Sequence, residues 1–289
     1  MTPEQLQEGA LCQLKIGKWD ASVRMSKDKL GKSVPKEIVR AMQDLVEDKT
    51  LLKDLNTIKR TTKNTLKNYS LPFPIDGVFW VPKNKITYLD EFFKEQKEEY
   101  MRRKEILKRK LPIMKRRFKE KYPKFYEERC YPTRPELDKK YYFKWNFFHF
   151  TVPDKKAQVL SPAQYKREQE KFKNMVKEME EMTVNLIGNE LLKRIDMLRK
   201  QCENNEINAG TVRSVDRFME KWNDLWKGNI DNKKMHGIMK SMRVQMKRTS
   251  ADKLKGNDDF RQKAAEKLEG IIGRIKKVPN FELKRKLDV

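Results

Sequence analysis

Residues 101–121, MRRKEILKRKLPIMKRRFKEK, carry eleven Lys and Arg side chains and only two acidic ones, Glu105 and Glu120. Apolar side chains recur in and just before this stretch at helical spacing, at Phe93, Tyr100, Leu107, Leu111, Met114 and Phe118. At roughly 100° per residue, these six positions fall on one narrow arc of an α-helix. The pattern therefore predicts a helix over residues 87–121 with one apolar face and one strongly cationic face.

Two further long helices are predicted on either side of this one along the chain. Residues 35–68 begin at Pro35, which suits the first turn of a helix, and they carry a single apolar stripe. Residues 161–203 begin with Ser161 as N-cap and Pro162 in the first turn, and their apolar side chains recur mainly at steps of three and four.

The helices 87–121 and 161–203 both have an apolar seam that needs a partner. We expect them to pair as a long antiparallel helical hairpin, similar to a coiled coil. Pro112 lies just off the apolar arc, so it is the place where the helix 87–121 would kink or fold back.

Three segments favour β-structure. Residues 11–25 alternate loosely between apolar and polar side chains, and residues 78–82 follow the tight-turn pair Asp76-Gly77. Residues 141–151 are rich in aromatic side chains, which favour a half-buried strand. We expect these three segments to form a small β-element.

Shorter helices are predicted in the last third of the chain, over residues 211–227, 233–248 and 257–272. The second of them carries a stripe of methionines, Met235, Met239, Met242 and Met246, which suits either an ordinary core or an adaptable docking surface. The expected fold is α+β and mostly α. We expect a core domain over residues 1–205 and a basic helical C-terminal region over residues 206–289.

The charge of the chain is strongly positive, with a formal net charge of +25 and a pI of about 9.8. Such a chain attracts polyanions by releasing their counterions, nucleic acid above all. A solvated helix face that only keeps the chain dispersed is the alternative explanation. An anionic membrane surface is less favoured, because few large apolar side chains lie on the cationic face.

The cationic face of residues 101–121 is regular. Arg102, Arg109 and Arg116 recur every seven residues, and Arg103, Lys110 and Arg117 follow one position later. This ladder would follow a phosphate backbone without reading its sequence, because phosphate contacts position a protein and base contacts give specificity. These six residues are the predicted nucleic-acid-binding residues.

The residues give no support for catalysis. The Gly-Lys-Ser at 31–33 lacks the earlier glycine of a phosphate-binding loop, since position 26 is Ser26. Pro74 stands where the lysine of a nucleotidyltransferase Lys-x-Asp-Gly core would be, before Asp76-Gly77. His149 and His236 have no second ligand at metal spacing. We therefore predict a non-enzymatic protein with no metal and no cofactor.

Cellular context is indicated by cysteine usage and by hydropathy. Cys12, Cys130 and Cys202 are few and far apart, so neither a disulfide framework nor a zinc site is expected. The first ten residues contain no apolar segment of an export signal, and no run is long enough to span a membrane. These features predict a protein of the reducing cytoplasm.

Two stretches, LKIGKWDASVRMSKDKLG and TIKRTTKNTLKNYSLPFPIDGVFWVP, together with the charged helix that follows, resemble a domain family of unknown function from bacteriophages and integrative elements. The resemblance covers roughly residues 10–200. Genes of that family often lie near those of MoxR-type AAA+ ATPases, similar to the cobaltochelatase small subunit, and of von Willebrand A-type proteins. The resemblance implies a phage or mobile-element protein in the host cytoplasm, but it carries over no catalytic residue.

The leading functional hypothesis is thus a phage accessory protein that binds the DNA or RNA backbone, acts as adaptor to an AAA+ machine, or does both. One alternative is a pure protein–protein adaptor without a nucleic-acid role. Another is a structural component of the virion. Self-association into a homo-oligomer is compatible with each of them.

Overall fold

The computed structural model describes residues 6, 8–25, 41–149, 161–228, 232–247 and 249–278. The predicted helix start at Pro35, the Gly-Lys-Ser at 31–33 and the end of the predicted strand 141–151 lie outside these residues. The chain forms two compact units. Unit 1 comprises residues 1–11, 68–83 and 148–289, and unit 2 comprises residues 12–67 and 84–147.

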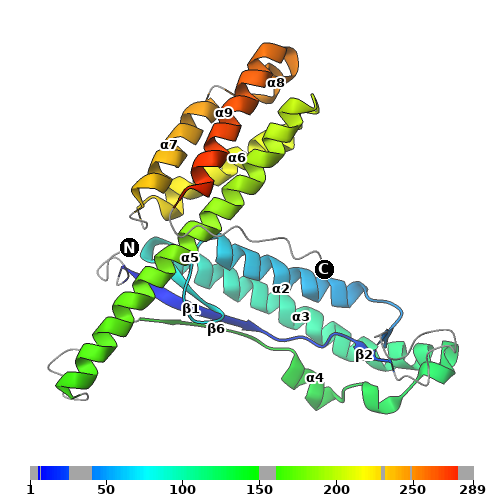
Figure 1. The fold of residues 1–289 in the computed structure, drawn as a ribbon. Helices are drawn as coiled ribbons and strands as arrows, with labels where there is room; N and C mark the ends of the chain where they lie inside the picture. The colour runs from blue at the N-terminus through cyan, green and yellow to red at the C-terminus, as the bar shows by residue number, and fades with distance from the viewer. Residues whose placement is uncertain are drawn as a thin grey trace. The chain divides into compact units, whose positions relative to one another are not determined.

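The fold is α+β and mostly helical, as predicted, with a small antiparallel sheet (Figure 1). In unit 1, β4 (Leu71–Pro72) pairs antiparallel with β5 (Val78–Pro82), with Leu71 opposite Trp80. The order of strands in the sheet is β4-β5-β1-β6. β1 (Gly9–Ile16) begins in unit 1 and continues in unit 2, where β6 (Phe143–Phe148) begins.

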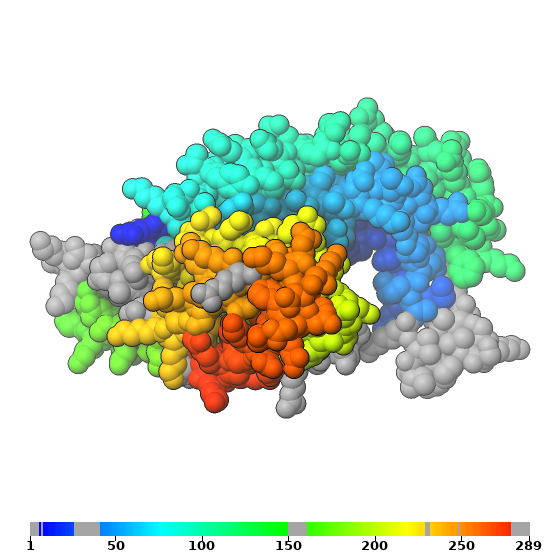
Figure 2. All heavy atoms as spheres, turned by 90° about the horizontal axis from the view of Figure 1, so that it is seen from above, coloured from blue at the N-terminus to red at the C-terminus, as the bar shows by residue number. Residues whose placement is uncertain are grey.

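Unit 1 is built around α5 (Pro162–Glu203), which packs on α9 (Asp258–Lys276) and α6 (Ala209–Lys221). α6 continues into the π-helix η5 (Trp222–Trp226), and α7 (Lys233–Lys247) and α8 (Ala251–Gly256) complete the helical group. The apolar faces of these helices form one continuous core with residues of β4 and β5, including Leu71 and Trp80. Figure 2 shows α7 to α9 gathered closely together at the C-terminal, orange-to-red end of the described chain.

Sequence signals for this unit are confirmed. Ser161 caps α5: its hydroxyl accepts a hydrogen bond from the Gln164 N–H, and the Gln164 side chain accepts one from the Ser161 N–H. This capping box, with Pro162 in the first turn, fixes the start of the helix. The predicted helices 211–227, 233–248 and 257–272 correspond to α6 with η5, α7 and α9.

The four methionines of α7, Met235, Met239, Met242 and Met246, are buried. They belong to the core of unit 1, together with apolar residues of the other C-terminal helices. Of the two alternatives left open by the sequence, the methionine stripe is therefore the ordinary core rather than a docking surface.

Unit 2 contains a pair of long helices, α2 (Thr50–Asn68) and α3 (Lys83–Lys121), which lie side by side in Figures 1 and 2. They run antiparallel, because Glu47, just before α2, contacts Lys121 at the end of α3, while Asp54 contacts Arg103 further back. Two 3₁₀ turns, η2 (Pro123–Phe125) and η3 (Glu128–Cys130), and α4 (Arg134–Lys140) then lead to β6.

Five of the six predicted positions of the apolar arc of α3 are buried, Phe93, Tyr100, Leu107, Leu111 and Phe118, and the sixth, Met114, is half-buried. Its aromatic side chains pack on the segment that returns from the end of α3. Tyr100 lies 5.9 Å from Phe143 and 6.1 Å from Tyr141, and Phe93 lies 5.8 Å from Trp145, between ring centroids.

The partner of this arc differs from the prediction. The expected hairpin joined 87–121 to 161–203, but these helices belong to different units. The hairpin in the structure joins α3 to α2, while α5 packs on α9 and α6. The spacing of apolar residues in the sequence predicted the buried faces of both helices, but it does not specify which other element packs against each face.

Three other predictions need correction. Residues 42–44, expected within the helix 35–68, form β3 (Met42–Asp44), which pairs antiparallel with β2 (Ser22–Arg24). The helix α2 begins only at Thr50, where the Asp48 side chain accepts a hydrogen bond from the Thr50 N–H. Pro112 does not fold α3 back, since the helix is continuous across it. The boundary at residue 205 is not a division of the structure, because α5 shares a core with the helices that follow it.

Candidate nucleic-acid interface

The cations of α3 fall into two groups that the sequence does not separate. One group forms ion pairs with carboxylates of the same unit. The other group is exposed to solvent, and it contains four of the six residues predicted to bind nucleic acid.

Arg102 and Arg103 belong to the first group. The Arg103 guanidinium bridges Asp54 Oδ2 on α2, at 2.9 Å, and Glu99 Oε1 on α3, at 2.7 Å. Arg102 Nη2 lies 2.6 Å from the other oxygen of Glu99. Hydrogen bonds from Arg103 and then from Arg102 hold the pKa of Glu99 below its ordinary value. These two guanidiniums are already neutralised by carboxylates of the same unit.

Four lysines in the strongly cationic part of α3, residues 101–121, also have carboxylate partners. Lys104 and Lys108 both lie 2.6 Å from the carboxylate of Asp138 on α4, and their hydrogen bonds lower its pKa. Lys115 pairs with Glu128. These contacts fasten the segment between η2 and β6 to the side of α3. At the end of the helix, Lys121 pairs with Glu47.

Arg109, Lys110, Arg116 and Arg117 belong to the second group, and we call these four residues the free ladder. All four are exposed, and within the described ranges of the chain none of them has an ion-pair partner within 4 Å. Arg109 Nε makes one long hydrogen bond, 3.4 Å, to the backbone oxygen of Glu105.

The free ladder extends over nine residues of helix, from Arg109 to Arg117, so its two ends are about 12 Å apart at 1.5 Å per residue. Ile113, in the middle of it, is 45% exposed. Two carboxylates just before α2, Glu47 and Asp48, lie in the field of the ladder. Hydrogen bonds from Thr50 chiefly lower the pKa of Asp48, and the charges of Lys110 and Arg117 lower it further. The positive charge of the ladder is therefore neutralised only slightly by these carboxylates.

The rest of unit 2 extends this positive character. Its residues include 34 Lys and Arg against 18 Asp and Glu, so it carries +16 of the total +25. On α2, a helix with Asp54 as its one acidic residue, Lys53, Arg60, Lys63 and Lys67 are exposed.

Sequence reasoning could not separate the two groups of cations. The carboxylates that neutralise the paired lysines lie far away along the chain, at separations of 13, 30 and 74 residues. Position on the helix gives no such signal either, because the paired Lys108 and the unpaired Lys110 lie at similar angles from the apolar arc, on opposite flanks.

Unit 2 contains a hollow of about 550 Å³ that includes no residue of the free ladder in its lining. It is lined by Lys18, Asp20, Arg129, Cys130 and Lys140, among others. Its charges are largely compensated, because Lys18 pairs with Asp20 at 2.8 Å and Arg129 with Glu127 at 2.9 Å. It offers no comparable set of free cations.

No protein-family model, curated protein or solved structure matches this chain. The resemblance to the phage domain family therefore stays a prediction. None of the helices in the described part of the chain combines the length and the apolar character needed to cross a bilayer. The described residues also contain no group of three or more His, Cys, Asp or Glu side chains placed to hold a metal ion.

Proposed function

We propose that this protein is a non-enzymatic accessory protein that binds the phosphate backbone of nucleic acid through the free ladder on α3. The observation that carries the proposal is the contrast within one helix. Arg102, Arg103 and the flanking lysines are paired, whereas Arg109, Lys110, Arg116 and Arg117 are exposed and have no ion-pair partner in the described structure. Contact with the ligand is therefore assigned to these four residues.

Such a surface binds without sequence preference. Arginine and lysine side chains on a regular helix contact phosphates, and no described feature of the ladder supplies a reading of base edges. Four neutralised phosphates predict that the logarithm of the affinity falls with the logarithm of the salt concentration with a slope of about −3 to −4. A solvated helix face would show no affinity beyond that of any similarly charged protein.

The test is fluorescence anisotropy with labelled single- and double-stranded DNA and RNA, at low and at physiological salt. The variant R109E/K110E/R116E/R117E should lose most of the affinity and flatten the salt slope. Its matched control is K166E/R167E/K173E/K177E, which changes the net charge equally at four exposed positions of α5 in unit 1. Comparing the two variants distinguishes the effect of the ladder on affinity from the effect of the net charge of the chain.

If both variants weaken binding equally, net charge alone causes the attraction and the ladder has no special role. If the unaltered protein binds nucleic acid no better than a lysine-rich control protein, the proposal fails. The adaptor hypothesis then predicts co-purification with an AAA+ or von Willebrand A-type partner. The virion hypothesis predicts many copies in purified particles.

A further inference from the structure

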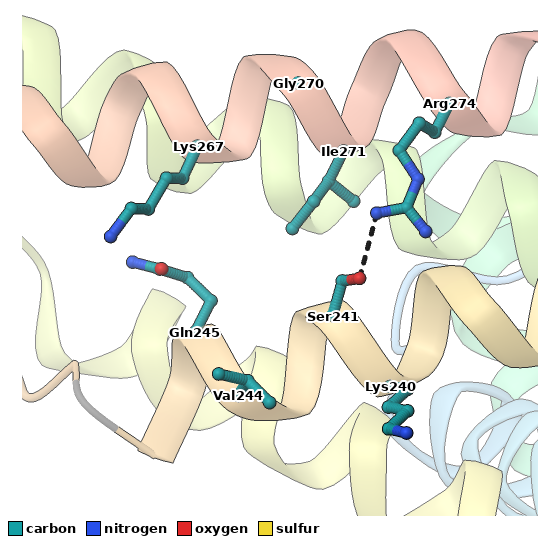
Figure 3. Close-up of a pocket in the computed structure, with 8 residues that line it drawn as sticks. All are labelled: Lys240, Ser241, Val244, Gln245, Lys267, Gly270, Ile271 and Arg274. Carbon is teal, nitrogen blue, oxygen red and sulfur yellow. Dashed lines mark hydrogen bonds between the residues drawn. The ribbon is translucent and has the colours of Figure 1, made fainter.

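An open groove lies between α7 and α9, within unit 1. Its volume is about 520 Å³. Figure 3 shows that both helices contribute residues to its lining, Lys240, Ser241 and Val244 from α7, and Lys267, Gly270 and Arg274 from α9. Val244 is 49% exposed, although it lies on the same helix as the buried methionine stripe. The groove therefore presents apolar surface that the core of unit 1 does not use.

The charged groups that line the groove are all positive. Lys240, Lys267 and Arg274 have no ion-pair partner among the residues that the structure describes, and no carboxylate is part of the lining. Arg274 Nη1 donates a hydrogen bond to Ser241 Oγ at 2.8 Å, which holds the guanidinium at the mouth (Figure 3). An occupant of this groove should therefore carry negative charge around an apolar surface.

Gly270 leaves one position of α9 in the lining of the groove without a side chain. It lies inside α9, where a glycine costs about 0.5–1 kcal/mol relative to alanine. A Cβ added at Gly270 would meet nothing within 4 Å, so packing within the described chain does not require a glycine there. The missing side chain leaves the backbone of α9 uncovered at this position of the lining.

We propose that the groove between α7 and α9 is a docking site for an acidic, amphipathic helical segment of a partner protein. Apolar side chains of the segment would lie over Val244 and Gly270, and its carboxylates would pair with Lys240, Lys267 and Arg274. Helix-in-groove docking uses this combination of apolar anchors at helical spacing and a charged rim. The site lies in unit 1, so this inference does not rest on the proposed function of α3.

A phosphate backbone is a poorer match for the groove than for the ladder. Between its cations, the groove has an exposed apolar side chain and an uncovered stretch of helix main chain. A phosphate backbone would need only the cations. A carboxylate on an amphipathic helix satisfies both features of the site at once.

The probe is a fluorescein-labelled synthetic peptide of about 18 residues, roughly five helical turns, with Leu at helical spacing on one face and Glu on the other. Anisotropy is measured with the full chain near physiological ionic strength. Gly270→Leu fills the groove, and it should weaken binding at least about tenfold, as the loss of a good interface anchor does. Lys267→Glu should weaken binding as well, through like-charge repulsion.

The matched control is Gly273→Leu. Gly273 lies three residues further along α9, an added Cβ there also meets nothing within 4 Å, and it is not part of the lining. This variant should bind the peptide as the unaltered protein does. Circular dichroism and thermal unfolding of each variant show that the helices are intact, so a loss of binding reports on the groove.

Several outcomes would overturn the proposal. No binding of the peptide, equal binding of a scrambled peptide of the same composition, or unchanged binding by Gly270→Leu would each do so. A fluorescent fatty acid that binds where the peptide does not would assign the groove to a small amphiphile instead. A loss of oligonucleotide affinity in the groove variants would make the groove part of a nucleic-acid surface, whereas failure of the ladder variants leaves this proposal standing.

Discussion

Arg103 on α3 bridges Asp54 on α2, with 2.9 Å between Nη1 and Oδ2, and both side chains are about one-third exposed. This ion pair, together with the pair between Arg103 and Glu99, ties the two long helices of unit 2 together. A residue six positions later, Arg109, has the same charge on the same helix but no such partner in the described structure. The two arginines should therefore have different roles.

Arg103→Ala should lower the free energy of unfolding by about 0.5–1 kcal/mol, because partly exposed ion pairs contribute about that much. Arg109→Ala should change it by less than about 0.5 kcal/mol, since it removes an exposed side chain. Urea denaturation of both variants measures the difference. Equal losses of stability would mean that the pair with Asp54 contributes nothing to the fold. Oligonucleotide binding should show the reverse order of effects.

Asp90 gives a pH dependence to unit 2. Its carboxylate accepts a hydrogen bond from the Trp145 indole at 2.8 Å and pairs with Lys94. The hydrogen bond from Lys94, and then that from Trp145, lower the pKa of Asp90. A lowered pKa means that this contribution to stability is fully present above the unfolded-state value of about 4. It is lost as the pH falls through the lower pKa of the folded state.

The prediction is a denaturation midpoint that decreases as the pH falls below about 4. In Asp90→Asn this decrease should be smaller, because the amide does not titrate over that range. Glu95→Gln, an exposed position on the same helix, is the control. An identical pH profile for Asp90→Asn and the unaltered protein would show that the contact between Asp90 and Trp145 does not link folding to pH.

Gly17 and Gly270 should respond in opposite ways to alanine. At Gly17, an added Cβ would lie 2.5 Å from the Lys140 carbonyl oxygen and still closer to the Tyr142 ring. Overpacking of this kind costs about 1–3 kcal/mol. At Gly270 the space is open, so alanine should stabilise α9 by about 0.5–1 kcal/mol. Thermal unfolding of the two variants tests both signs, and a destabilised Gly270→Ala would contradict the open groove.

Met242 and Val244 test the two faces of α7. Met242 is 0% exposed, so Met242→Ala should cost about 2–5 kcal/mol through lost burial and an unfilled cavity. Val244→Ala, at an exposed position two residues away, should cost less than about 0.5 kcal/mol. Chemical denaturation measures both. A large loss for Val244→Ala would mean that this side chain is part of the core rather than of a docking surface.

Much of the local structure could be predicted from the sequence, for reasons that act over a few residues. The helical spacing from Phe93 to Phe118 specified the apolar face of α3. Ser161, Pro162 and Gln164 specified the start of α5 through a capping box. The strand over residues 78–82 followed from the turn before it and from its apolar side chains. Each of these signals is complete within one or two helical turns or one strand.

Tertiary contacts decided the rest. Met42 lies at helical spacing from Ile38 and Leu45 in the sequence, but pairing of residues 42–44 with Ser22–Arg24 makes them a strand. The partner of α3 was decided by aromatic residues of β6 and by Asp54, neither of which periodicity identifies.

The same holds for the candidate site. The sequence by itself determined that one face of α3 carries a ladder of cations, because like charges recur there every seven residues. Only the folded chain decided that Arg103 forms an ion pair with Asp54, while Arg109 and Arg116 stay exposed. A charge is a property of a residue, but its neutralisation depends on carboxylates brought close by the fold from distant parts of the chain.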